Sequence, residues 1–269
     1  MSKTFYKLIC HFHKYFLLIK NIGIFEFFRL KRLDKFKKTS SKLFGEKINM
    51  VDSSTYLSLV NEIFIDEIYK FNSKNDENVI IDCGANIGLA TIYFKLRFPN
   101  SKIIAFEPDP NIFDVLNANI KSFNFSNIDL HNSAISNIEG FVNFEMNGAL
   151  SGMISNSALN SNTVSVKSVR LKDFLAKYNQ IEFLKIDIEG HEDYVMEDIK
   201  EELIKVNYLF LEYHSFIERP QILDKILRII SEANLRYYIK ESEFKKDPFI
   251  SRSIFLNMDT VLNIFCYRD

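Results

Sequence analysis

Short apolar runs alternate with helical stretches through most of this 269-residue chain. The runs with strand character are 79–82, 102–106, 128–135, 182–188 and 207–213. The helical stretches between and after them are 88–98, 110–121, 191–204 and 220–233. The apolar runs show little alternation with polar residues, which is typical of strands buried on both faces. The pattern predicts an α/β fold, with a mostly parallel sheet covered by helices on both faces.

Further elements are expected on either side of this region. Helices are predicted at 5–30 and 54–71, with Ser53 or Ser54 as the cap of the second. Extended segments at 141–146 and 163–171 flank a loop rich in Gly, Ser and Asn at 147–162. Segments 236–240 and 253–256 are expected to form a closing pair of strands.

Charge divides the chain into a basic arm and an acidic body. Residues 1–47 hold 12 Lys/Arg and 3 Asp/Glu, a net charge of +9, and residues 48–269 carry a net charge of −10. We therefore expect an N-terminal helical arm at 1–47 and one catalytic domain at 48–269. A basic arm favours an anionic partner, although an ordinary solvated helix face would look the same.

Residues 1–30 contain an apolar stretch that Lys20 and Glu26 interrupt. The stretch is too short for a spanning helix, and no small-residue cleavage site follows it. Two hypotheses remain: a peripheral helix on the inner face of a membrane, or a face that packs on the domain or on a second subunit. The second is preferred, so a homo-oligomer stays open.

The three cysteines, Cys10, Cys83 and Cys266, are widely spaced and form no CxxC pair. This excludes a recognisable zinc motif and a disulfide framework. A reducing, cytoplasmic location is the expectation.

Two of only eight glycines lie in the stretch IDCGANIG, which follows the first strand. Asp82 ends the strand, Gly84 begins the turn and Gly88 opens the next helix. Glycine permits backbone angles closed to other residues and close approach to the main chain. Gly88 is expected to allow tight packing of the helix on the strand. Neither GxGxxG nor a phosphate-binding GKS/T sequence is present.

Glu107 ends the second strand, 25 residues after Asp82. An acid at this place commonly accepts hydrogen bonds from both hydroxyls of a ribose. Since binding sites of open parallel sheets lie beyond the carboxyl ends of the strands, the two loops together predict a cofactor that contains adenosine.

These motifs resemble those of class I S-adenosylmethionine-dependent methyltransferases, and more narrowly the FkbM-type family. The resemblance covers about residues 78–240 and is carried by IDCGANIG at 81–88, FEP at 106–108, Leu116, Asn119, NSA at 132–134, LKIDIEGHE at 184–192, and Leu211-Glu212. It implies a Rossmann-like, mostly parallel seven-stranded sheet. It also implies O-methylation, mostly of sugar or polyketide hydroxyls.

The resemblance also assigns residues to the cofactor S-adenosyl-L-methionine. Its methionine end would be held by Asp82, Gly84, Ala85, Asn86 and Gly88. Glu107, followed by Pro108, would bind the ribose, and Ala134 would lie near the adenine. The chemistry agrees, because this cofactor has no phosphates and carries an ammonium group, for which Asp82 is the expected carboxylate.

The block at 184–192 places Asp187, Glu189, His191 and Glu192 after a strand. Asp187 is expected to point into the cleft near the transferred methyl. For Glu189 and Glu192 there is an alternative to a role in the site: either can stabilise the N-terminus of the next helix electrostatically.

Glu212 and His214 project to the same face of the next strand. They are expected to orient one another beside an acceptor hydroxyl, unless they are only a solvated pair. The candidate bases, in order, are His214, Asp187 and His191. Asp187, Glu189 and Glu212 are also potential ligands of a divalent ion, but their spacing is no metal signature and no metal is expected.

Three other functions were weighed against methyl transfer to a small-molecule or glycan acceptor. A fold that only binds cofactor is disfavoured by the intact motifs. A nicotinamide-dependent oxidoreductase would require a third glycine where Leu89-Ala90-Thr91 stands. A nucleic-acid substrate is disfavoured because no base-flipping motif is present and the catalytic body is acidic.

Overall fold

The computed structural model describes residues 22–75, 77–146, 152–154, 163–242, 247–250 and 257–268. A seven-stranded sheet forms its centre, in the order β12-β13-β11-β10-β3-β4-β5. Its strands are β3 (Val79–Cys83), β4 (Lys102–Phe106), β5 (Ile128–His131), β10 (Ile181–Ile186), β11 (Val206–Phe216), β12 (Arg236–Glu241) and β13 (Met258–Tyr267). Only β13 runs antiparallel to its neighbours, so the predicted mostly parallel sheet is confirmed.

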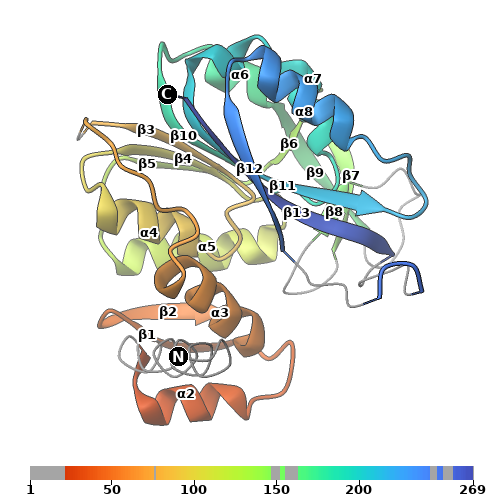
Figure 1. Ribbon diagram of the computed structural model, residues 1–269. Helices are drawn as coiled ribbons and strands as arrows, with labels where there is room; N and C mark the ends of the chain where they lie inside the picture. The colour runs from red at the N-terminus through yellow and green to blue at the C-terminus, as the bar shows by residue number, and fades with distance from the viewer. Residues whose placement is uncertain are drawn as a thin grey trace, which may run out of the picture.

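Helices cover both faces of this sheet (Figure 1). One face carries α4 (Leu89–Arg97) and α5 (Pro110–Ser122), and the other carries α6 (Leu171–Leu175), α7 (Glu192–Ile199) and α8 (Leu223–Glu232). Successive strand residues serve opposite faces: Ile80 belongs to the core under α4 and α5, and Ile81 to the core under α7 and α8. This double burial explains why the strands read as continuous apolar runs.

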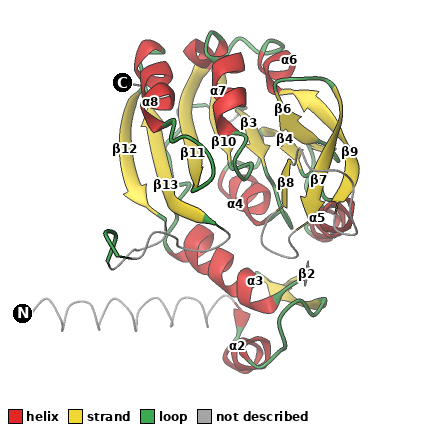
Figure 2. Cartoon of the chain, turned by 90° about the vertical axis from the view of Figure 1, so that its right-hand side faces the viewer, coloured by secondary structure: helices red, strands yellow, loops and turns green. Residues whose placement is uncertain are grey.

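A second, four-stranded sheet lies at the edge where β5 ends (Figure 2). It has the order β6-β9-β7-β8 and consists of β6 (Ala134–Ser136), β7 (Gly140–Met146), β8 (Gly152–Ile154) and β9 (Thr163–Arg170). The predicted strand 128–135 is therefore wrong as one element. It divides at 132–133 into β5 and β6, which belong to different sheets.

The N-terminal part is less helical than expected. After α2 (Ile24–Lys31), a hairpin forms from β1 (Thr39–Leu43) and β2 (Glu46–Met50). The hairpin crosses the expected boundary at 47/48, and its side chains Leu43, Ile48 and Met50 are buried in the main core. Residues 1–21, which include most of the expected helix 5–30, lie outside the described residues.

The predicted helix 54–71 is shorter and differently capped. It consists of α3 (Ser53–Val60) and a π-helical turn at Asn61–Ile65. Asp52, rather than Ser53 or Ser54, is the cap, and its carboxylate accepts a hydrogen bond from the backbone N–H of Thr55 at 2.8 Å.

Two further predictions concern the C-terminal strand and the helix after β10. The expected strand 253–256 lies outside the described residues, and the final strand is β13. The helix expected at 191–204 ends at Ile199 and is followed by a short 3₁₀ helix, Glu202–Lys205. Within the described residues, no helix is both long and apolar enough to cross a membrane.

Candidate active site

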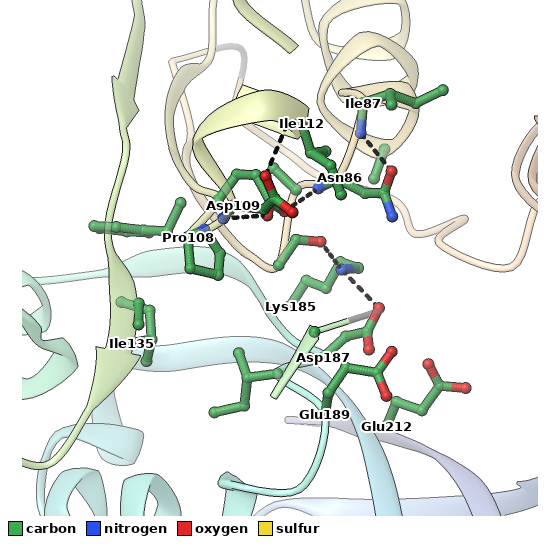
Figure 3. A pocket seen from close by; sticks show the side chains of 18 of the residues that line it. Asn86, Ile87, Pro108, Asp109, Ile112, Ile135, Lys185, Asp187, Glu189 and Glu212 are labelled. Carbon is green, nitrogen blue, oxygen red and sulfur yellow. Dashed lines mark hydrogen bonds and ion pairs between the residues drawn. The ribbon is translucent and has the colours of Figure 1, made fainter. Parts of the chain in front are cut away.

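A cavity of about 180 Å³ lies at the carboxyl ends of β3, β4, β10 and β11 (Figure 3). The loops singled out from the sequence therefore meet at one place. Eight predicted site residues line it: Gly84, Ala85, Asn86, Glu107, Pro108, Ala134, Asp187 and Glu212. Four others do not line it: Asp82, Gly88, His191 and His214.

Gly84 is required by close contact with the neighbouring strand end. Its φ is +84°, and a Cβ there would lie 1.9 Å from the carbonyl oxygen of Asp187. The backbone N–H groups of Gly84 and Ala85 both donate to the carbonyl of Phe106, at 3.0 and 2.8 Å. The turn is thus fastened to the ends of β4 and β10, and the main chain that approaches Gly84 is the protein's own.

Gly88 serves helix packing, but against a different partner from the one expected. Its φ is +93°, and a Cβ would lie 2.7 Å from Cδ1 of Leu116 on α5. Asn119 of the same helix donates to the carbonyl of Ile87 at 2.8 Å and also bonds to Asn49 in the hairpin. Gly88, Leu116 and Asn119 therefore join α4, α5 and β2 behind the cavity.

Glu107 is held by backbone donors. One carboxylate oxygen accepts from the N–H of Asn86 at 2.9 Å, and the other accepts from the N–H of Asp109 at 3.0 Å. The side chain lines the cavity although the residue is only 6% exposed. Burial raises the pKa of Glu107 to about 8, against the lowering effect of these two hydrogen bonds.

Asp82 does not take the position expected of it. The residue is fully buried, and its carboxylate accepts a hydrogen bond from Oγ1 of Thr91 at 2.7 Å. Its other oxygen lies 3.5 Å from Nζ of Lys185. Since Asp82 lies beneath the cavity and not on its wall, it does not offer its carboxylate to a ligand there.

Lys185 links the two halves of the site, a role that sequence reasoning missed. Its ammonium group donates to the carbonyl of Gly84 at 2.8 Å and lies 3.1 Å from Oδ2 of Asp187. Burial disfavours its charge, but Asp187, Tyr69 and Asp82 raise the pKa of Lys185 well above its ordinary value. The available signal was a lysine inside an otherwise apolar buried strand, which requires a partner.

Three carboxylates stand close to Lys185 on the other side of the cavity (Figure 3). Burial raises the pKa of Glu189 to about 7, and burial together with Asp187 raises the pKa of Glu212 to about 8. Burial also acts on Asp187, but Lys185 and His214 hold its pKa below the usual value. Glu189 has a φ of +56°, an uncommon conformation that occurs here at a cavity wall.

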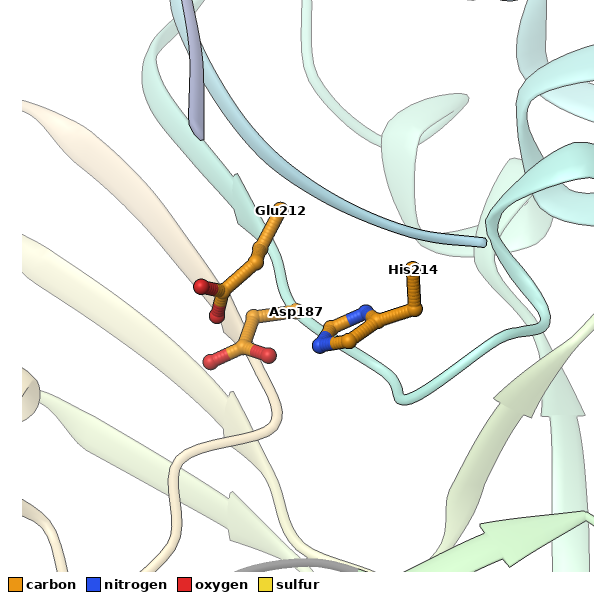
Figure 4. Close-up of side chains that lie close together, drawn as sticks. All are labelled: Asp187, Glu212 and His214. Carbon is orange, nitrogen blue, oxygen red and sulfur yellow. The ribbon is translucent and has the colours of Figure 1, made fainter. Parts of the chain in front are cut away.

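His214 shares a strand face with Glu212, as predicted, and lies close to Asp187 (Figure 4). Its Nδ1 is 2.9 Å from a Glu192 oxygen, and its Nε2 is 3.4 Å from a Glu189 oxygen. Burial alone would lower the pKa of His214, but Glu192 and Glu189 raise it well above the ordinary value. These two carboxylates favour the protonated ring, and both ring nitrogens face them rather than the cavity, where a first-choice base was expected.

His191 is separated from these groups. It caps the N-terminus of α7, stacks on Tyr194 with ring centroids 4.8 Å apart, and places Nε2 3.4 Å from Oγ of Ser136. It is therefore not positioned as a base in the cavity. Glu192 takes the structural role left open for it, because it accepts from the N–H of Gly190 at 2.9 Å and pairs with His214.

Other parts of the chain complete the cavity wall. Thr55, Leu59 and Ile63 come from α3 and the π-helical turn, and Phe144 comes from the second sheet. Sequence reasoning placed none of these at the site, because their contact depends on packing between distant segments. Of the predicted loop at 147–162, Gly152 and Ile154 reach the cavity, and residues 147–151 and 155–162 lie outside the described residues.

Comparison with known proteins connects this site to a family. The family model described as the Methyltransferase FkbM domain matches residues 82–237, more than half of the chain. Methyltransferase 1 of Beauveria bassiana is 30% identical over 167 residues, which cover 52% of this chain and 66% of that protein. The hexuronic acid methyltransferase AglP of Haloferax volcanii is 29% identical over 181 residues, which cover 66% of this chain and 71% of that protein.

One solved structure is Methyltransferase FkbM from Methylobacillus flagellatus, with 16% sequence identity and a TM-score of 0.47. The match covers 79% of this chain and 53% of that one. The matched family domain spans the strands and loops that build the cavity, from Asp82 through β10 and β11 to β12. The chain belongs to the FkbM family of methyltransferases.

Proposed function

We propose that the protein transfers a methyl group from S-adenosyl-L-methionine to a hydroxyl of a sugar or of another glycan or natural-product acceptor. The observation that carries this proposal is the placement of Glu107. Its carboxylate is fixed by two backbone N–H groups on the wall of the same cavity that Asp187 and Glu212 line.

The donor and acceptor groups of the cavity fit this cofactor. Glu107 offers carboxylate oxygens to the two hydroxyls of a ribose, and Ala134 lies on the same wall. On the opposite side, Asp187, Glu189 and Glu212 provide negative charge for a sulfonium and an ammonium group. Because Asp82 is buried below the wall, these three carboxylates are the better partners for the ammonium group.

A sugar-like acceptor is supported by one relative, whose name describes it as a hexuronic acid methyltransferase. Carboxylates on the cavity wall are suitable acceptors of hydrogen bonds from sugar hydroxyls. Thr55 and Leu59 of α3 also line the cavity, and they offer one polar and one apolar contact to an acceptor.

The bound cofactor supplies an activated methyl group: the carbon–oxygen bond forms while the carbon–sulfur bond breaks and its electron pair stays on sulfur. Asp187, held by Lys185 at 3.1 Å, orients the acceptor hydroxyl and takes its proton. Glu189, with its pKa raised to about 7, changes protonation state near neutral pH and passes that proton to solvent. Positioning contributes about 7–11 kcal/mol to such a reaction, and a base about 10²–10⁴-fold.

Calorimetry with S-adenosylhomocysteine tests the cofactor assignment. Glu107→Gln should weaken binding about 10–150-fold, because hydrogen bonds to a charged group contribute about 1.5–3 kcal/mol. Glu182→Gln is the matched control, since Glu182 is also buried but pairs with Asn207 at the opposite edge of the sheet. Equal affinity in wild type and Glu107→Gln would contradict the assignment.

The acceptor is tested separately with labelled S-adenosylmethionine and a panel of nucleotide-activated sugars, free glycans and small natural products. The proposal expects label on an oxygen of a sugar-containing acceptor. Transfer confined to protein, lipid or nucleic-acid acceptors would contradict it.

A further inference from the structure

We propose that Asp187, Glu212 and His214 form a binding site for one divalent cation of the Mn²⁺ type, at the wall of the cavity. The role given to the cation rests on the proposed methyl transfer, but the site itself rests on the geometry of these three side chains. It lies where the ends of β10 and β11 meet.

The three side chains have the spacing that a bound ion requires. One ligand atom from each lies within 4.8 Å of the other two. Small divalent cations bind oxygen and nitrogen ligands at about 2.0–2.2 Å, so neighbouring ligands are about 3 Å apart and opposite ones about 4.3 Å apart. Figure 4 shows a ring nitrogen of His214 directed toward the Asp187 carboxylate. A small inward movement of these side chains would complete the coordination.

Each of the three ligands is held by a further side chain. Nδ1 of His214 pairs with Glu192 at 2.9 Å, and Nε2, which lies 3.4 Å from a Glu189 oxygen, would exchange that partner and its proton for the cation. Lys185 contacts Oδ2 of Asp187, and Oγ of Ser242 donates to Oε1 of Glu212 at 2.9 Å, so each carboxylate keeps one oxygen. Supporting contacts of this kind orient the ligands in metal sites, including the pairing of a ligating histidine with a carboxylate.

Charge favours a cation at this place. Asp187, Glu189, Glu192 and Glu212 outnumber the neighbouring cationic side chains Lys185 and His214. His214 is 8% exposed and Glu192 is 2% exposed, so solvent screens little of this excess. Two carboxylates and one imidazole suit Mn²⁺, since carboxylate favours hard ions and imidazole favours transition metals.

A cation here would explain how an acceptor hydroxyl is activated without a free histidine. Bound to the ion through its oxygen, the hydroxyl would lose its proton more readily, and Glu189 would take that proton in place of Asp187, which then binds the ion. The methyl transfer itself is unchanged, because the proton leaves the oxygen and the new bond forms to carbon.

Binding of Mn²⁺ to the full-length protein, freed of metal with a chelator and then dialysed, tests the site. Calorimetry and the electron paramagnetic resonance of bound Mn²⁺ should show one ion per chain. Glu212→Gln and Asp187→Asn should each weaken binding at least 10-fold, and Glu232→Gln, an exposed change at the end of α8, should not. Thermal melting shows whether each variant is folded.

Two results would overturn the site: no Mn²⁺ bound to the wild type at millimolar concentration, or equal affinity in all folded variants. Binding of S-adenosylhomocysteine by the same metal-free protein separates this proposal from the proposed function. Cofactor binding without Mn²⁺ binding refutes only the metal site, and Mn²⁺ binding without cofactor binding refutes only the proposed cofactor.

Discussion

The two sides of the cavity differ in how many carboxylates they hold and in what compensates their charge. At the ends of β3 and β4, the single carboxylate of Glu107 is held by backbone N–H groups. At the end of β10 and on the adjacent part of β11, several carboxylates are crowded together, and Lys185 and His214 balance part of their charge. In the proposed function, the first side binds the neutral diol of the ribose, and the second binds positive charge and moves protons.

Lys185 lets these two sides coexist. It reaches the carbonyl of Gly84 on the first side and Asp187 on the second, while Asp82 lies 3.5 Å below it. The comparison shows the role of a buried cation: without the charge of Lys185, the carboxylates of Asp82 and Asp187 would lack a cationic partner, and backbone hydrogen bonds alone would not compensate their charge. Removing that cation should affect both sides at once.

Lys185→Met should have the largest effect on stability. It leaves Asp82 and Asp187 without their cation, and breaking a buried ion pair costs about 3–5 kcal/mol. The free energy of unfolding, measured in urea, should fall by that amount. Lys200→Met is the control, because Lys200 and Glu197 form an exposed pair, which contributes little to stability. Equal losses in both variants would show that Lys185 does not join the two sides.

Gly84→Ala should have the next largest effect, because the new Cβ would collide with the carbonyl of Asp187. Backbone strain at positive φ and overpacking together cost about 2–5 kcal/mol. Gly45→Ala separates the two causes: Gly45 has a φ of +92° with nothing within 4 Å of the added Cβ. It should lose only about 1–2 kcal/mol. If both variants lose the same amount in urea denaturation, contact between the strand ends is not what requires Gly84.

The difference between the two sides also marks what the sequence could predict. The first side depends on local signals, a glycine turn and an acid that each follow an apolar strand, and Gly84 and Glu107 lie where those signals placed them. The second side depends on which charges become neighbours after folding. The sequence predicted that Asp187, Glu212 and His214 would converge. That the ring of His214 favours its protonated form follows from its distances to Glu192 and Glu189, which the spacing of these residues in the sequence does not reveal.

The predicted position of Asp82 on the cavity wall differs from the observed one for a related reason. A residue near the end of a central strand points either into the cavity or into the layer below, and a side chain on the neighbouring helix decides between them. Here Oγ1 of Thr91, on α4, binds the carboxylate in the buried layer. The split of 128–135 into two strands was equally hidden, because the two strands are separated by only two residues and belong to different sheets.

The smallest change per pH unit, and the sharpest comparison, is in the pH dependence of stability. Burial raises the pKa of Glu107 and of Glu212 to about 8, from about 4.5 in the unfolded chain. Between these values the folded protein holds protons that the unfolded chain has released. The free energy of unfolding should therefore fall as pH rises from 5 to 8, by at most about 1.4 kcal/mol per pH unit for each group. Glu107→Gln and Glu212→Gln should each make that fall less steep in thermal unfolding.

A bound ligand should then tell the two sides apart. Ribose hydroxyls donate to the ionised form of Glu107 and lower its pKa, so saturating S-adenosylhomocysteine should remove the part of the slope that Glu107→Gln removes. The part due to Glu212 should shrink less, because that ligand offers the carboxylates its ammonium group but lacks the charged sulfonium and brings no metal ion. One pH unit of slope corresponds to about 2–4 °C in melting temperature for a chain of this size, which is measurable. If the ligand leaves the pH dependence of stability unchanged, Glu107 does not bind the ribose, and the role assigned to the first side of the cavity is wrong.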